Sequence, residues 1–195
     1  MKLKVNEVFD SIQGEGDWMG TVCTFIRLPG CNFKCPFCDT NFDSSAVELD
    51  TDTYAFQRHV VITGGEPTVH VRIGELCNDL MLKGYRVHIE TNGTKIAAIP
   101  SGVWITCSPK RDEWNQSVLK PDWKEQIWRL AEIKLVVDED FDPTPFVQLT
   151  PKMIWLQPCD GPNIEKSKAR ITSIIQDYPT VFKAGIQLHK YYEVL

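Results

Sequence analysis

The stretch from residue 21 to residue 41, TVCTFIRLPGCNFKCPFCDTN, sets a short apolar run directly before three closely spaced cysteines. The run is rich in β-branched and aromatic residues, which predicts a strand. Cys31, Cys35 and Cys38 follow it with C-x3-C-x2-C spacing. The chain therefore carries a strand that opens into a loop of three thiols.

Further apolar runs that end in polar or glycine-rich turns recur along the chain, at residues 59–63 (HVVIT), 86–90 (RVHIE), 103–107 (VWITC), 132–137 (EIKLVV) and 153–157 (MIWLQ). Their apolarity is continuous rather than alternating, which predicts strands buried on both faces, as in a parallel sheet. Such a sheet needs helices between its strands.

Helices are predicted at residues 69–83, 122–131 and 164–178. The first has one apolar face and Gly84 at its end, and Pro179 ends the last. Residues 42–58 are polar and weakly periodic, which argues against a crossover helix there. Repeated β-turn-α-β units predict an α/β fold, with one domain over residues 1–195 and polar turns gathered at the carboxyl ends of the strands. An ordinary Rossmann sheet is the main alternative, but no G-x-G-x-x-G follows the first strand.

Composition excludes several classes of function. The net charge is −5 and no basic run occurs, which argues against broad coating of nucleic acid. No apolar stretch approaches the ~20 residues of a membrane span, and the start, MKLKVNEVFD, lacks the apolar segment of a signal peptide. We therefore expect a cytoplasmic protein, in which the seven cysteines are ligands or buried thiols rather than disulfides.

Three thiols suit an iron–sulfur cluster with one open iron. Thiolates select Zn, Cu(I) or iron–sulfur clusters, and a structural zinc site takes four protein ligands. The loop has no nearby His, and a fourth thiol would have to come from Cys23, Cys107 or Cys159, the first two of which stand in apolar strand runs. A zinc knuckle or a set of buried thiols remains the alternative.

The spacing resembles the signature of the radical S-adenosylmethionine (radical SAM) superfamily, in which the open iron binds the methionine moiety of the cofactor. Residues 63–67, TGGEP, follow the next strand and resemble that superfamily's motif for the methionine amino group. Two glycines allow a close backbone approach, and Glu66 can accept from an ammonium. Alone, this segment would be a plain turn.

The substrate is indicated by residues 10–16, DSIQGEG, and by Arg27. Gln13 and Glu15 offer an amide and a carboxylate, which can pair with the edge of a guanine-like or pterin-like ring. Arg27 ends the strand before the thiols, where a guanidinium suits a carboxylate. Its alternative partner is one of the chain's own acids.

Taken in order, FDSIQGEG, FIRLPGCNFKCPFCDT, TGGEP, ETNGT, CSPK and QPCDGP resemble the 7-carboxy-7-deazaguanine synthase family over nearly the whole chain. The resemblance implies an incomplete (β/α)6 barrel, a modified radical SAM core with mainly parallel strands. It also implies a carbon–nitrogen lyase that converts 6-carboxy-5,6,7,8-tetrahydropterin to 7-carboxy-7-deazaguanine with loss of ammonia. That reaction is a radical ring contraction in queuosine and 7-deazapurine biosynthesis.

The resemblance also implies a set of site residues. The [4Fe-4S] cluster would be held by Cys31, Cys35 and Cys38, and Mg2+ by Thr40. S-adenosylmethionine would contact Phe37, Cys38, Asp39, Gly64, Gly65, Glu66, Gly93, Ser108, Pro109, Lys110, Gln157, Pro158, Cys159 and Asp160. The pterin would contact Ile12, Gln13, Gly14, Glu15, Arg27, Thr91 and Leu195. No further catalytic residue is assigned.

The implied partners are a second copy of the chain and a flavodoxin or ferredoxin-type electron donor, with no direct contact to nucleic acid or membrane. The enzyme rival is an activase for a glycyl-radical enzyme, which shares the cysteine loop. DSIQGEG and Arg27 argue against it, because a protein substrate needs no clamp for a pterin. The non-enzyme rival is a zinc-binding interaction module.

Overall fold

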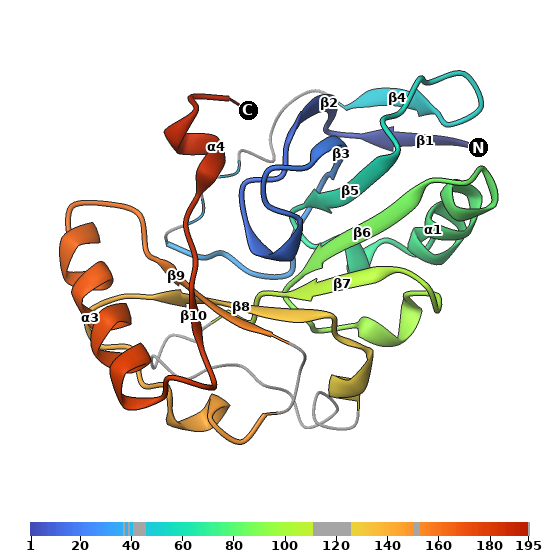
Figure 1. Cartoon of the computed structure of the whole chain (residues 1–195). Coiled ribbons are helices and arrows are strands. Elements are labelled where there is room, and N and C mark those ends of the chain that lie inside the picture. The colour runs from blue at the N-terminus through green and yellow to red at the C-terminus, as the bar shows by residue number, and fades with distance from the viewer. Residues whose placement is uncertain (37, 39, 41–45, 111–125, 150–152, 195) are drawn as a thin grey trace.

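The computed structural model describes residues 1–36, 38, 40, 46–110, 126–149 and 153–194. Its centre is an eight-stranded sheet with the order β10-β9-β8-β7-β6-β5-β3-β2 (Figure 1). The strands are β2 (Glu7–Ile12), β3 (Val22–Leu28), β5 (His59–Gly64), β6 (Arg86–Thr91), β7 (Trp104–Cys107), β8 (Glu132–Val137), β9 (Ile154–Pro158) and β10 (Lys183–Ala184). Neighbours pair in parallel from β3 to β10, whereas β2 runs antiparallel to β3.

The predicted α/β fold with a mainly parallel sheet is confirmed. All six apolar runs form strands, each within two residues of its predicted bounds. Helix α3 (Ile164–Asp177) also lies where the sequence predicts it.

Helix α1 (Ile73–Leu82) is shorter than the predicted helix over 69–83. The chain first forms the short 3-10 turn η2 (Pro67–Val69), in which the Glu66 side chain accepts from the Thr68 amide. His70 is then extended, at φ −77° and ψ 122°, so the helix cannot begin before the residues that follow it.

The helix predicted over 122–131 lies partly outside the described residues, which resume at 126. There the 3-10 turn η4 (Ile127–Arg129) is followed by the extended Leu130, at φ −76° and ψ 127°. A helix as far as residue 131 is therefore wrong, because β8 begins at Glu132 and needs extended backbone before it.

Two parts of the fold were not predicted. Strands β1 (Lys2–Val5) and β4 (Val47–Asp50) form a separate antiparallel pair, so the polar segment after the cysteine loop contributes a strand. As expected, the structure shows no helix between residues 46 and 58. The chain ends with β10 and the short helix α4 (Leu188–Tyr191), which lies near β2 and β3 in Figure 1.

The two faces of the curved sheet differ in chemistry. One face forms the apolar core with the helices, through buried residues such as Leu76, Ile89 and Ile174. The other face carries buried polar side chains, among them His88, Glu132 and Lys134. The strands are thus buried on both faces, as predicted, but one of these faces encloses a polar interior.

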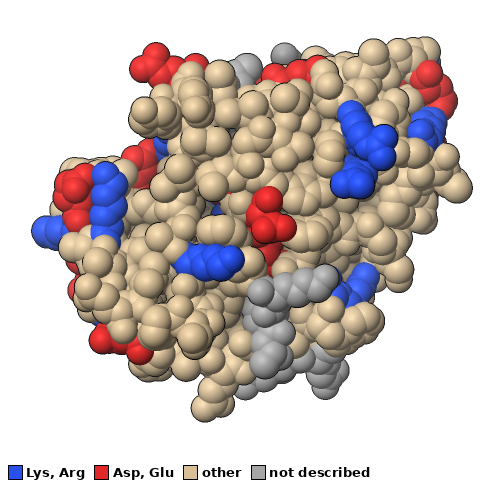
Figure 2. Space-filling view, viewed as in Figure 1, with Lys and Arg blue, Asp and Glu red and all other residues tan. Residues whose placement is uncertain are grey.

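The outer surface carries mixed charge. On the face shown in Figure 2, Lys and Arg occur in small groups separated by uncharged surface rather than as one continuous basic area. Within the described part of the chain, none of the helices has the length and apolarity that a membrane crossing requires.

Candidate active site

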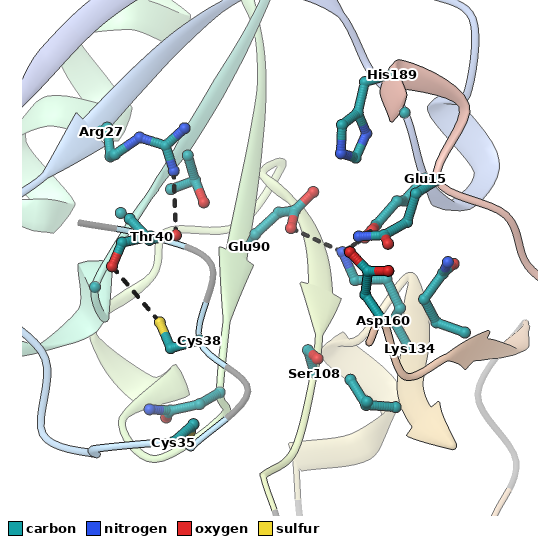
Figure 3. A pocket seen from close by; sticks show the side chains of 18 of the residues that line it. Glu15, Arg27, Cys35, Cys38, Thr40, Glu90, Ser108, Lys134, Asp160 and His189 are labelled. Atoms are coloured by element: carbon teal, nitrogen blue, oxygen red, sulfur yellow. Dashed lines mark hydrogen bonds and ion pairs between the residues drawn. The ribbon is translucent and has the colours of Figure 1, made fainter. Parts of the chain in front are cut away.

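A cavity of about 780 Å³ lies inside the curve of the sheet (Figure 3). Most residues that the sequence singled out line it: Ile12, Gln13, Gly14, Glu15, Arg27, Cys31, Cys35, Cys38, Thr40, Gly64, Gly65, Glu66, Thr91, Ser108, Lys110, Gln157, Pro158, Cys159 and Asp160. Gly93 and Pro109 are described but do not line it. Phe37, Asp39 and Leu195 lie outside the described residues.

The cysteine loop (residues 31–40) forms one wall of the cavity. Cys31 and Cys38 are exposed and Cys35 is half-buried. The Phe33 amide donates to Cys31 Sγ at 3.4 Å, as backbone amides do to sulfur in metal–thiolate sites. Asn32 fixes the loop to the end of β6, since its Oδ1 accepts from Asn92 Nδ2 at 2.8 Å.

The thiols of this loop interact electrostatically. Burial raises the pKa of Cys35, Lys110 lowers it, and Cys38 and Cys31 raise it further. Thiolates that repel one another in this way are stabilised by a shared cation. The arrangement therefore suits a positively charged iron–sulfur core.

The cysteines of the strands and of helix α1 are poor ligands by comparison. Cys23, Cys77 and Cys107 are buried. Burial raises the pKa of Cys23 and of Cys77 to about 12 and holds the pKa of Cys107 well above its usual value.

Within the described ranges, no three His, Cys, Asp or Glu side chains converge on a point where one metal ion would sit. The three thiols of the cysteine loop line the cavity together, and cysteine thiolates are the ligands of iron–sulfur clusters. The donor set thus fits a cluster.

Gly64 and Gly65 join two strand ends. A Cβ atom at Gly64, where φ is +132°, would lie 2.1 Å from the Leu28 carbonyl oxygen, and one at Gly65 would lie 1.8 Å from the Gly30 carbonyl oxygen. The Glu66 amide also donates to the Gly30 carbonyl at 2.9 Å. The space that side chains would fill is therefore occupied by the backbone that leads into the cysteine loop.

Glu66 is 1% exposed and ties the ends of β5 and β6 together. Its Oε1 accepts from the Thr68 hydroxyl at 2.5 Å and from the Thr91 hydroxyl at 2.6 Å. Its Oε2 accepts from the Asn92 amide at 2.6 Å. The Thr91 hydroxyl also accepts from the Gly93 amide at 3.0 Å. This second bond fixes the hydroxyl that donates to Glu66.

The floor turn (residues 13–18) comes from the opposite end of the sheet. Because β2 is antiparallel to the other strands, its last residue lies at their amino ends. Gln13 Nε2 donates to Glu90 Oε1 at 2.8 Å, and Gln13 Oε1 accepts from the Glu15 amide at 3.2 Å. The turn therefore presents an amide and a carboxylate to the cavity from below.

Lys134 connects the floor turn to the sheet. Its ammonium pairs with Glu15 and, at 2.9 Å, with Glu90, and its side chain is 8% exposed (Figure 3). Burial alone would lower the pKa of Lys134, but the two carboxylates raise it above its usual value. Burial alone would likewise raise the pKa of Glu90, yet Lys134 holds it below its usual value. Lys134 and Glu90 are thus both charged at neutral pH.

Sequence reasoning missed Glu90 and Lys134, although a signal was present. His88 and Glu90 stand two residues apart in β6, as Glu132 and Lys134 do in β8. Polar residues at alternate positions of an otherwise apolar strand share one face, which indicates a polar interior.

An aromatic wall adjoins Arg27. The rings of Phe9 and Phe25 stack at 5.2 Å with 7° between their planes, and the Arg27 guanidinium lies 5.5 Å from the Phe9 centroid. Arg27 Nε donates to Glu7 at 2.5 Å, so the alternative ion pair with an acid of the chain is present. Another guanidinium nitrogen lies 3.5 Å from the Thr40 hydroxyl (Figure 3).

The end of the chain borders the cavity. The Leu188 amide donates to the Gly14 carbonyl at 2.9 Å, and a Cβ atom at Gly14 would lie 1.8 Å from His189 Nδ1. Lys190 pairs with Asp160 at 2.5 Å. The first two contacts place α4 against the floor turn, the third joins it to the segment after β9, and none of them was predicted.

The cavity therefore has two unlike walls. One side carries Cys35 and Cys38 together with Arg27, whose guanidinium lies 3.5 Å from Thr40 of the same loop, and the other carries Glu15 and Lys134 (Figure 3). A planar polar ring with a carboxylate would fit between the two sides, with the carboxylate at Arg27 and the polar edge of the ring at Glu15.

Comparison with known proteins agrees with this chemistry. Residues 25–102 match the Radical SAM superfamily. The 7-carboxy-7-deazaguanine synthase of Bacteroides thetaiotaomicron is 36% identical over 200 residues, and the match covers all of both chains. The enzyme of the same name from Aquifex aeolicus is 40% identical over 152 residues, which cover 71% of this chain and 67% of the relative.

A solved structure is similar over the whole fold. The crystal structure of QueE from Escherichia coli has a TM-score of 0.75 and 27% sequence identity, with 97% of this chain and 95% of that chain covered. The similarity thus extends over nearly all of both chains.

Proposed function

The chain belongs to the 7-carboxy-7-deazaguanine synthases of the radical SAM superfamily, and we propose that it converts 6-carboxy-5,6,7,8-tetrahydropterin to 7-carboxy-7-deazaguanine with loss of ammonia. As a radical SAM enzyme it uses a [4Fe-4S] cluster and S-adenosylmethionine. The observation that carries the substrate proposal is that one cavity brings together three thiols, Arg27, Gln13 and Glu15.

In this proposal Cys31, Cys35 and Cys38 hold the cluster. When bound, the cluster and S-adenosylmethionine supply the one-electron chemistry that starts the reaction by hydrogen abstraction. Ser108 and Lys110 stand side by side, with Nζ 2.9 Å from Oγ, which suits the carboxylate of the methionine moiety. The other predicted contacts are Phe37, Asp39, Gly64, Gly65, Glu66, Gly93, Pro109, Gln157, Pro158, Cys159 and Asp160.

The substrate carboxylate would bind Arg27. Glu7 and the Phe9 ring fix the guanidinium before a ligand arrives, which lowers the entropy lost on binding. The stacked Phe9 and Phe25 rings would exclude water beside the pterin. Ile12, Gly14, Thr91 and Leu195 complete the predicted substrate contacts.

The polar edge of the pterin would bind Gln13, Glu15 and Glu90. Lys134 pairs with both carboxylates and holds the pKa of Glu90 below its usual value, and carboxylate oxygens act as acceptors for the ring and exocyclic N–H groups. This requirement for acceptors at fixed positions would discriminate against rings that lack those donors.

Mg2+ would bind at Thr40. A single neutral hydroxyl is a weak ligand for a hard cation, so substrate oxygens and waters must complete the shell. The position of Thr40 beside Arg27 supports this, since an ion there would meet the same carboxylate that the guanidinium binds.

We extend the proposal to the setting of the enzyme. It would be a single radical SAM domain over residues 1–195, a cytoplasmic homodimer that receives electrons from a flavodoxin or ferredoxin-type protein. The similarity to the Bacteroides thetaiotaomicron relative over all of both chains supports the single domain.

One assay tests the proposed function. The anaerobically reconstituted protein is incubated with S-adenosylmethionine, Mg2+, a reductant and 6-carboxytetrahydropterin, and the product is identified by mass. We expect 7-carboxy-7-deazaguanine together with 5′-deoxyadenosine. Absence of the deazaguanine from a protein that carries its cluster and cleaves S-adenosylmethionine would refute the substrate assignment.

A further inference from the structure

Glu132, at the start of β8, is a fully buried carboxylate, 0% exposed, for which the site described above has no role. Its Oε1 accepts from the Thr106 hydroxyl at 2.5 Å, and its Oε2 accepts from Trp155 Nε1 at 2.8 Å. These two donors belong to the neighbouring strands β7 and β9. The carboxylate is thus fixed by the sheet on both sides.

The floor turn rests directly on this carboxylate. The Asp17 amide donates to Glu132 Oε2 at 2.9 Å, across 115 residues of sequence. Gly16, at φ +70°, approaches so closely that a Cβ atom there would lie 2.4 Å from Glu132 Oε1. Two separate features of the turn, a hydrogen bond and a close contact, therefore depend on the same side chain.

The floor turn also packs on strands β5 and β6 through Trp18. Its ring lies 4.7 Å from the His59 ring and 4.9 Å from the His88 ring, centroid to centroid. Ring contacts at these distances stabilise the packing but make no bond to the backbone of the turn. They hold the floor turn against the sheet. They do not fix the position of its backbone along the sheet, as a hydrogen bond to a charged acceptor does.

The register of the turn decides where Glu15 points. Glu132 and Lys134 lie two residues apart on one face of β8, so Glu132 binds the backbone of the turn while Lys134 binds its Glu15 side chain. A shift of the backbone would draw Glu15 away from Lys134 and Gln13 away from Glu90.

We propose that Glu132 is a positioning residue for substrate binding, which holds the floor turn through the Asp17 amide and thereby sets the direction of Gln13 and Glu15. This inference rests on the proposed function, because it assumes that these two side chains bind the pterin. Glu132 itself does not touch the substrate.

A pair of substitutions at one exposed position isolates the hydrogen bond. Asp17→Ala keeps the amide, whereas Asp17→Pro removes its N–H, and the φ of proline suits a 3-10 turn. Glu132→Gln is the conservative third variant, because its amide retains one acceptor oxygen of the same size. All three are compared with the wild type as reconstituted holoenzymes.

We expect Asp17→Pro to raise the KM for 6-carboxytetrahydropterin roughly 10- to 100-fold, the effect of one hydrogen bond to a charged group. Asp17→Ala should keep the wild-type KM, and Glu132→Gln should lie between. The KM for S-adenosylmethionine and the iron content should stay within about 2-fold of the wild type, and 5′-deoxyadenosine should form in excess over product.

A second measurement needs no substrate. Hydrogen exchange followed by mass spectrometry should show faster exchange in the peptide that spans residues 13–21 for Asp17→Pro and Glu132→Gln, with exchange elsewhere unchanged. Unchanged exchange in that peptide, or a KM for S-adenosylmethionine that rises with that for the pterin, would overturn the inference. A wild type that binds but does not convert the pterin would refute the proposed function, while the exchange result would still decide whether Glu132 holds the turn.

Discussion

The substitution Lys134→Met removes the cation between Glu15 and Glu90 and keeps the length of the side chain. The exposed fractions of the three side chains are 8%, 13% and 21%, so the variant leaves two carboxylates mostly buried and unpaired. Breaking a buried pair in this way costs about 3–5 kcal/mol of unfolding free energy. We expect a value near the lower end, about 3 kcal/mol, because neither carboxylate is fully buried. For a chain of this size that corresponds to a Tm lower by roughly 6–12 °C.

The dependence of this loss on pH identifies its cause. The pKa of Glu90 is held below its ordinary value of 4.5, so the wild type gains stability from Glu90 above that pH and loses it as the pH falls further. In the variant this pKa is no longer lowered, so Glu90 takes up a proton earlier and at little cost. The difference between the two proteins should therefore shrink as the pH falls below 4.5, to under about 1 kcal/mol near pH 2, which is about the pKa of Glu90 in the wild type.

The assay is urea unfolding of the anaerobically reconstituted proteins, followed by far-ultraviolet circular dichroism at a series of pH values. Lys166→Met is the matched control, since its pair with Glu139 is exposed and is worth under about 1 kcal/mol. Adding Glu90→Gln to Lys134→Met should recover part of the loss. A difference that stays constant with pH, or that equals the loss for Lys166→Met, would refute the reasoning.

Three further predictions concern the cavity. Replacing Cys31, Cys35 or Cys38 by Ala should abolish cluster absorbance and product formation. The control Cys159→Ala, in the same cavity, should retain near-stoichiometric iron. Iron loss in Cys159→Ala alone would contradict the cluster assignment. Arg27→Gln should raise the KM for the carboxylated pterin roughly 10- to 100-fold, as expected for a charged hydrogen-bonding pair, and should not change inhibition by a tetrahydropterin that lacks the carboxylate. If both ligands weaken equally, Arg27 does not bind the carboxylate. Thr40→Val should raise the Mg2+ concentration needed for half-maximal activity several-fold with little change in the KM for S-adenosylmethionine, and an unchanged Mg2+ titration would place the ion elsewhere.

The strands and their turns were predictable because each depends on local composition. The apolar runs at 59–63 and 132–137 are β-branched and end in turn-forming residues, and both form strands. The thiol spacing is equally local, and the assignment of these three cysteines as a ligand set stays a prediction from that spacing. Helix α3 was predictable because its periodic face packs on the sheet and Pro179 follows it closely.

The remaining features depend on partners distant in sequence. Strand β4 forms only because β1 pairs with it, and β10 pairs with β9 over two residues, too few to leave a pattern. Lys134 belongs to the site because Glu15 meets it across 119 residues. The start of α1 depends on Glu66, whose carboxylate accepts from the Thr68 amide and so caps the short turn η2. The extended His70 after this turn delays the helix.

The hydrogen bond between Asp17 and Glu132 has a consequence for biosynthesis of the chain. The floor turn leaves the ribosome among the first residues, but its acceptor is made 115 residues later. At about 5–20 residues per second, the turn waits roughly 6–25 s for Glu132, longer than most local folding events take. During that interval the hairpin of β2 and β3 exposes Trp18 until its partners His59 and His88 have been made and folded. Slow codons between positions 18 and 132 would prolong this exposure, so the yield of folded enzyme should depend on the translation rate there.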